Sequence, residues 1–537
     1  MNILKRKVVV FLVFSFLVML GFIIHKDYGI GIDEPINRKN GVISLNYILT
    51  KFDIKNNAGS LRNDPALENY KETLQNYKDQ DYGVVLDLPL IIVERVFEIN
   101  DTAKQYEMRH LVNYLIFILS AFALYQISSV RFNSWKVGLF SVLLLVTSPR
   151  IFAESFYNNK DILFLSLFII SAYTMLRAIK KPSIVNIILH GVMCSIVINV
   201  RIAGIIFPLL MMPIFILLKL QNRINYVELF KLYSIYTVVT VIVTILLWPW
   251  LWSNPIENFK QALLNMSQFR WIGWVQFNGS YYPSNNLPWK YIPFWIIIST
   301  PILYSLLFAT GLINIIINLM RSGRKFYENN NNIDDIFFLI LLFSMPVATI
   351  VLNSVLYNGW RHLYFIYPFF ILIATNGLVF ILSYIKRNIK TKSIFYSIII
   401  INIIFTVIWM SSAHPFQNVY FNKIAGKNWI NKFETDYWGL STTTALRYIL
   451  KNDNREKIKI KSIQFLPLEY AKLMLSNNDK KRLIVVHNIN EADYILTHHQ
   501  FVSNKESELW KEKFKSLKKF HDIKVQSEII FSIYKNN

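Results

Sequence analysis

Two adjacent carboxylates, Asp33 and Glu34, lie in the stretch GIGIDEPIN at 29–37, directly after the first long apolar run. Pro35 disfavours the α conformation for Glu34, which predicts an extended or turned backbone at this point. The two glycines of the stretch let that backbone approach another segment closely. Because a carboxylate can accept a proton from a hydroxyl or amine nucleophile, we predict that Asp33 is a catalytic base at a membrane surface. The alternative is a solvated acidic pair at the end of a span.

A second charged group lies in SPRIFAESFYNNKD at 148–161, which contains Arg150, Glu154, Lys160 and Asp161. Arg150 and Glu154 are four residues apart and Glu154 and Asp161 seven, so all three share one face if the segment is helical. Arginine can bind a phosphate through two hydrogen bonds and stabilise it as it leaves. The alternative is a helix-capping network with an internal ion pair, which explains one or two of these residues.

Three further basic residues lie beside apolar runs. Arg201 lies in INVRIAG between two such runs, and an arginine at that depth indicates a functional site unless it reaches the lipid headgroups. Arg361 and His362 lie in YNGWRHLYFIYP at the start of another run and have the same two interpretations. Arg109 and His110 are weaker candidates of the same kind. Together with the carboxylates, these side chains could hold a phosphate beside a base.

The apolar runs that must position these residues predict a membrane protein. The chain has 537 residues, of which 53% are hydrophobic, and a mean hydropathy of +0.34. Runs of about 18 apolar residues predict membrane-spanning helices, and the first, which follows MNILKRK, resembles an uncleaved signal anchor. We predict about eleven spans, near 8–24, 110–129, 137–149, 162–179, 184–200, 203–219, 231–252, 291–319, 335–356, 362–384 and 394–412.

Lysine and arginine residues predict the orientation of these spans. The segment Lys5–Lys7 predicts a cytoplasmic N-terminus. With alternating spans, the cytoplasmic segments are all basic; they are 130–136, 177–183, 219–231, 321–334 and 385–393. The net charge of +23 is therefore a topology signal and does not indicate binding to nucleic acid. The candidate site residues then lie on the outer face, together with 25–109, 253–290 and everything after 413.

The outer segments differ from one another in pattern. Segment 25–109 contains amphipathic pieces at 65–77 and 88–98 that would lie along the membrane interface. Segment 253–290 is rich in aromatic residues, as interface anchors or a substrate platform would be. Residues 414–537 lose the apolar runs and predict strands at 457–466, 481–488, 492–499 and 524–535, with helices at 440–451, 468–476 and 507–519. The predicted fold class is a polytopic α-helical membrane protein (1–413) with a small C-terminal α/β domain (414–537) outside the cytoplasm.

The chain resembles the GT-C superfamily of integral-membrane glycosyltransferases, in particular the branch with protein O-mannosyltransferases and the lipid A aminoarabinose transferase. The resemblance covers nearly the whole chain. It depends on the acidic pair, on the motif at 148–161, on GWRHLYFIYP at 359–368, and on HPFQNVYFN at 414–422 followed by FETDYWGLS at 433–441. From its residues alone, we expect HPFQNVYFN to dock the C-terminal domain onto the membrane.

The resemblance implies inverting transfer of a sugar from a polyprenyl-phosphate donor, outside the cytoplasm of a bacterial cell, at the plasma membrane. Asp33 would be the base, with Glu34 beside it. Glu34, Glu154 and Asp161 would hold sugar or acceptor hydroxyls. The donor phosphate would contact basic residues, for which the candidates are Arg150, Lys160, Arg201, Arg361 and His362. The sequence identifies neither the sugar nor the acceptor, which could be a glycan, a lipid or a protein.

No cofactor is predicted. A cluster of Asp33, Glu154 and Asp161 could bind a divalent metal, as relatives with pyrophosphate donors require, but relatives with monophosphate donors work without one. The sequence contains no Walker-type glycine loop, no Cys/His zinc spacing and no GxSxG motif.

Two other functions remain open. A transporter or flippase for a lipid-linked or anionic substrate would carry charges near the middle of its spans, whereas the charges of this chain lie at one face. A non-catalytic anchoring protein would depend on residues 414–537 alone.

Overall fold

The computed structural model describes residues 3–54, 73–267, 269–385, 388–463, 468–501 and 503–536. Within these ranges, nine helices are long and apolar enough to cross a membrane, or ten if the bent pair α6–α7 counts as one span. The nine are α1 (Ile3–Ile24), α5 (Thr102–Arg131), α8 (Asp161–Lys180), α10 (Ile206–Leu220) with the short helix η2 (Ile202–Ile205), α11 (Tyr226–Leu247), α14 (Ile302–Ser322), α15 (Asn330–Val351), α16 (Tyr367–Tyr384) with η5 (Arg361–Ile366), and α17 (Ile389–Ser412).

The described part of the chain therefore has nine or ten such spans, where about eleven were predicted. The predicted run at 184–200 is α9 (Ile184–Val200), a helix of 17 residues. The run at 137–149 ends where α6 (Trp135–Val146) bends by 72° into α7 (Pro149–Tyr157). The run at 291–319 is divided into α13 (Tyr291–Ser299) and α14. Both breaks lie at a proline, because the residue before a proline is pushed out of the α region: Ser148 and Thr300 are both extended.

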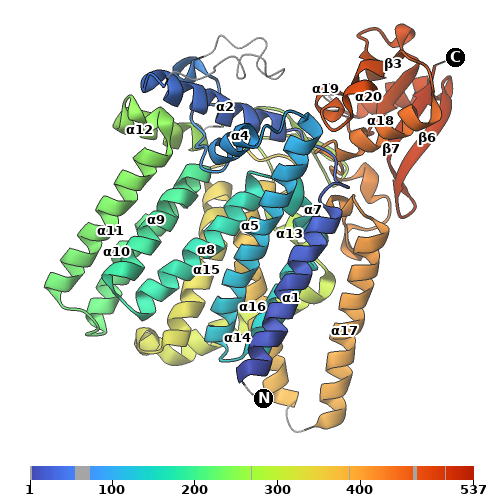
Figure 1. The fold of residues 1–537 in the computed structure, drawn as a ribbon. Coiled ribbons are helices and arrows are strands. Elements are labelled where there is room, and N and C mark those ends of the chain that lie inside the picture. The colour runs from blue at the N-terminus through green and yellow to red at the C-terminus, as the bar shows by residue number, and fades with distance from the viewer. Residues whose placement is uncertain are drawn as a thin grey trace.

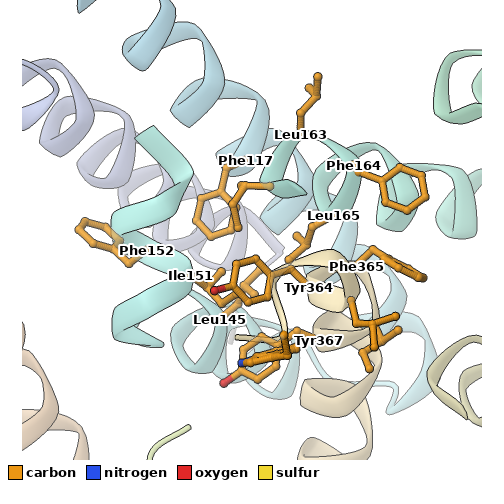
Figure 2. Close-up of a cluster of buried hydrophobic side chains, with 14 of the residues drawn as sticks. Phe117, Leu145, Ile151, Phe152, Leu163, Phe164, Leu165, Tyr364, Phe365 and Tyr367 are labelled. Carbon is orange, nitrogen blue, oxygen red and sulfur yellow. The ribbon is translucent and has the colours of Figure 1, made fainter. Parts of the chain in front are cut away.

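The hydrophobic core lies where α5, α7, α8 and α16 meet. Figure 2 shows Phe117 of α5, Ile151 of α7 and Leu165 of α8 pointing toward Tyr364 of η5, and the structure buries all four of these side chains. By contrast, α1 and α17 expose apolar side chains along much of their length. Exposed apolar faces of this kind are expected where lipid surrounds a helix.

The candidate site lies at the end of the bundle that carries the irregular elements. Helices α2 (Glu34–Lys51), α4 (Asp87–Val96) and α12 (Pro255–Ser267) lie across the same end as the C-terminal sheet, opposite the N-terminus (Figure 1). The amphipathic helix predicted at 88–98 is α4. The one predicted at 65–77 lies mostly outside the described residues, and its end forms the short helix η1 (Leu74–Asn76).

Strands β1 (Trp274–Phe277) and β2 (Ser280–Pro283) form a hairpin in the aromatic segment. Its turn is Asn278–Gly279, with φ of 51° and 81°, the dipeptide and conformation that two-residue hairpins favour.

Residues 440–536 contain a five-stranded sheet with the order β4-β3-β5-β7-β6. Strands β3 (Ile458–Ser462), β4 (Leu483–Val485) and β5 (Tyr494–Thr497) are parallel, and β6 (Lys518–Val525) and β7 (Glu528–Lys535) form an antiparallel pair. The helices are α18 (Leu440–Asn452), α19 (Leu468–Lys472), α20 (Asn477–Arg482) and α21 (Asn504–Lys515). The sequence predicted four of the strands and missed β6, because the lysines at its start extended the predicted helix at 507–519.

The end of the bundle opposite the site is held by two buried acids of α15. Arg131 of α5 donates two hydrogen bonds to Asp335, at 2.7 and 3.0 Å, and Lys180 of α8 donates one to Asp334 at 2.8 Å. These pairs join three spans. Arg131 and Lys180 also belong to the basic segments that predict the cytoplasmic side.

Candidate active site

Asp33 and Arg361, 328 residues apart in the chain, form an ion pair at the sheet-bearing end of the bundle. The Nη1 of Arg361 donates to Oδ2 of Asp33 at 2.7 Å, and the side chain of Asp33 is 33% exposed whereas that of Arg361 is 4% exposed. The acidic pair was predicted on an extended or turned backbone; Asp33 lies in a turn, but Glu34 is the first residue of α2. Proline is tolerated in the first turn of a helix, where its missing N–H would have no partner.

Asp161 continues this pair into a chain of alternating charges. Its carboxylate accepts a hydrogen bond from Nη2 of Arg201, and its Oδ2 lies 3.5 Å from Nη1 of Arg361. Asp161 is buried at the start of α8, whereas the Arg201 side chain, at the break between α9 and η2, is 23% exposed. The order is therefore Asp33, Arg361, Asp161, Arg201, with both ends accessible and the middle buried.

Lys160 lies beside this chain in a buried position. Its Nζ lies 4.4 Å from the centre of the Tyr82 ring. Burial lowers the pKa of the Lys160 ammonium to about 8, against the opposing effect of Asp87. Burial also raises the pKa of the Asp87 carboxyl, which accepts a hydrogen bond from Nη1 of Arg109 at 3.1 Å. Lys160 is therefore mainly cationic at pH 7 and loses its charge over the next two pH units.

Glu154 and Arg150 form a second group on α7. Oε1 of Glu154 accepts from the hydroxyls of Tyr364 and Tyr437, at 2.8 and 3.0 Å. The Arg150 guanidinium carbon lies 5.4 and 5.3 Å from the ring centres of Trp295 and Phe421.

Asn158 connects the two groups. Its Nδ2 donates to Oε2 of Glu154 at 2.8 Å and to Oδ2 of Asp161 at 3.1 Å. The second outer loop thus positions acids of both groups.

Glu34 and His362 lie at the edges of the site. Glu34 is 1% exposed, and its carboxylate accepts the N–H of Gly31 at 2.7 Å and lies 3.0 Å from Nε2 of His110. Glu34 thereby holds the loop that carries Asp33. The half-buried His362 ring packs against Tyr357, with ring centres 4.6 Å apart. Among the described residues, His362 forms no hydrogen bond or ion pair with Asp33 or Asp161.

Several residues of the site were not predicted. Tyr364, Tyr437 and Trp438 all lie in motifs that carry the family resemblance, but phenols and indoles gave no signal of acid–base or phosphate chemistry. Glu434 is also buried; it accepts the N–H of Gly359 at 3.1 Å, and burial raises its pKa to about 8.

The described residues contain no group of three or more His, Cys, Asp and Glu side chains arranged to hold a metal ion. Asp33 and Asp161 contact guanidinium groups, and Glu154 contacts two tyrosines. A shared cluster of these three carboxylates is therefore not formed in the described part of the chain.

A sequence profile of the dolichyl-phosphate-mannose-protein mannosyltransferase family matches residues 96–249. The crystal structure of ArnT from Cupriavidus metallidurans in the apo state is similar to this chain, with a TM-score of 0.50 and 10% sequence identity over 99% of this chain and 98% of that one. The chain has an ArnT-like GT-C fold. No curated protein matches the sequence significantly.

The apolar helices and the two comparisons support a multi-pass membrane protein with this fold, in agreement with the resemblance found in the sequence. The matched segment 96–249 contains Arg150, Glu154 and Asp161 but not Asp33 or Arg361. The residues outside it belong to the site by their contacts in the structure.

Proposed function

We propose that this protein transfers a sugar from a polyprenyl-phosphate donor to an acceptor on the outer face of a bacterial plasma membrane. The N-terminus would be cytoplasmic, residues 1–413 would form the membrane part and 414–537 the outer domain. The opposite positions of the N-terminus and the C-terminal sheet support this orientation (Figure 1), as do the basic segments between spans.

The observation that carries the proposal is the partly exposed Asp33 carboxylate, which lies beside the buried guanidinium of Arg361 and near the partly exposed one of Arg201. A base must be reached by the acceptor, and Asp33 is one-third exposed. A leaving phosphate needs positive charge that is already in place. Arg361 pairs directly with Asp33, and Arg201 is linked to Arg361 through the carboxylate of Asp161.

Unused hydrogen-bond donors support a phosphate site among these arginines. The buried Nε atoms of Arg150, Arg201 and Arg361, and Nη1 of Arg150, have no hydrogen-bond partner among the described residues. A buried donor without a partner costs about 1–3 kcal/mol, and phosphate oxygens could satisfy such donors.

The reaction would be a single displacement. Asp33 accepts the proton of the acceptor hydroxyl or amine as that atom attacks the anomeric carbon, and the new bond forms on the face opposite the phosphate. The bond between the anomeric carbon and the phosphate oxygen breaks, and its electron pair leaves with the polyprenyl phosphate. The positive charges of Arg361 and Arg201 balance the negative charge of the released phosphate. Lys160 adds a further positive charge while it is protonated.

The remaining acids would position the side chains and the loop that form the site. Asp161 orients both arginines, Glu154 holds Tyr364 and Tyr437, and Glu34 fixes the loop of Asp33. His362 lies next to Arg361 and would line the donor side. No metal is part of the proposed mechanism.

The test is a panel of polyprenyl-phosphate sugars, presented to the purified chain in lipid nanodiscs with membrane extract as the source of acceptors. We expect one donor to release polyprenyl phosphate and form a glycosylated product. Movement of the donor across the membrane of proteoliposomes, without formation of product, would indicate a flippase instead. The proposal would be contradicted if no donor in the panel gave either transfer or movement.

A further inference from the structure

A short segment of the outer part, 433–440, enters the site from the C-terminal side. Tyr437 donates to Glu154, and Glu434 accepts from the backbone at Gly359, two residues before Arg361. The segment leads directly into α18 and the C-terminal sheet. The outer α/β region is therefore joined to the charged site by side chains as well as by the chain itself.

Trp438 contacts Arg361 and the residue directly before Asp33. Its main-chain carbonyl accepts the N–H of Ile32 at 3.2 Å, next to Asp33. Its ring centre lies 4.6 Å from the Arg361 guanidinium carbon, and Tyr357 lies 4.9 Å away from the same carbon. With the ring 2% exposed, this cation–π contact is shielded from water, where such contacts are strongest.

The backbone around Trp438 is built for this close approach. Gly439 has φ of 74°, a conformation that glycine adopts without strain. Asp436 accepts the N–H groups of Leu440 and Ser441, at 3.3 and 2.8 Å, which fixes the start of α18. A Cβ on Gly29 would lie 2.5 Å from the carbonyl oxygen of Leu440, so the acidic loop can lie against this segment only with glycine there.

From these contacts we infer that Trp438 is a positioning residue that holds the Asp33 carboxylate and the Arg361 guanidinium in register, and that the outer α/β region keeps the site assembled by supplying it. The inference rests on the proposed function, because it assigns Trp438 a role in that same site. Trp438 acts through Arg361 and the Asp33 loop and takes no part in the chemistry itself.

A double-mutant cycle tests the link to Arg361. Donor consumption is measured for the full chain in nanodiscs with Trp438→Leu, Arg361→Gln and both together, using the donor that the panel identifies. We expect Trp438→Leu to lower turnover at least tenfold, Trp438→Phe to restore part of it, and the double variant to match Arg361→Gln, because contacting residues are not additive. Trp510→Leu is the control, since Trp510 packs in a separate apolar cluster of the outer region, and it should keep wild-type turnover.

Amide hydrogen exchange tests the link to the Asp33 loop without any substrate. We expect Trp438→Leu to speed exchange in peptides covering 29–37 while Trp510→Leu does not. Losses that multiply in the double variant, or unchanged exchange at 29–37, would overturn the inference. If the wild-type chain consumes no donor, the proposed function fails, and the exchange measurement still decides whether Trp438 holds the loop.

Discussion

Arg361→Lys is the substitution whose effect follows most directly from the geometry of the site. The guanidinium places one nitrogen 2.7 Å from Asp33 and 3.5 Å from Asp161, and it lies between two aromatic rings. A lysine keeps the charge but loses the planar group that can serve both acids and both rings.

The size of the effect can be worked out from these contacts. Losing one of two charge-assisted contacts costs about 1.5–3 kcal/mol, and the weaker stacking adds about 0.5–1 kcal/mol. The sum of about 3 kcal/mol predicts roughly a 100-fold loss in kcat/KM. The assay is initial-rate release of polyprenyl phosphate, with the unfolding temperature measured in parallel.

Arg455→Lys provides the matched control. Arg455 also lies between two aspartates, Asp453 and Asp493, each at 2.7 Å, but its side chain is 48% exposed. Exposed ion pairs contribute little, so the control should change kcat/KM less than threefold. If Arg361→Lys also stays within threefold of the wild type, the reasoning about a shared, buried guanidinium is refuted.

Three further predictions follow from the site and its support. The glycosylated product should have the anomeric configuration opposite to that of the donor, as seen by NMR, and retention would contradict a single displacement by an acceptor that Asp33 deprotonates. Donor affinity should weaken between pH 7 and pH 9 as Lys160 loses its proton, because burial lowers its pKa to about 8. Lys160→Gln should flatten that pH dependence, and an equally steep profile in the variant would assign it to another group. Asp335→Asn should lower the unfolding temperature, because breaking a buried ion pair costs about 3–5 kcal/mol. The folded fraction should keep its turnover. An unchanged melting curve would contradict the conclusion that the Arg131–Asp335 pair stabilises the bundle.

The spans were predictable because lipid imposes one simple pattern on a helix. Each predicted run contains at least one helix, and two of the runs are bent or divided at a proline, Pro149 and Pro301. The hairpin turn at Asn278–Gly279 could have been predicted from its dipeptide. The segment was instead interpreted from its aromatic content, as interface anchors or a substrate platform. Strand β6 begins with lysines on an exposed edge of the sheet, so its sequence lacks the alternation of a buried strand.

The candidate site was predictable only as a set of residue types. The sequence suggested that carboxylates and arginines from distant loops converge, and the structure brings Asp33 to Arg361 and Arg201 to Asp161. The sequence did not indicate that Glu34 would be buried against His110, because two adjacent acids look alike in a sequence. Trp438 was missed because its role depends on packing against Arg361, which no local pattern encodes.

The central claim is tested most directly by donor turnover with Asp33→Asn, an isosteric change that removes the proposed base. General-base catalysis is worth roughly 100- to 10,000-fold, so we expect a loss in that range in the release of polyprenyl phosphate, with unchanged donor binding and an unchanged unfolding temperature. Turnover within tenfold of the wild type would show that Asp33 is not the base and would contradict the account.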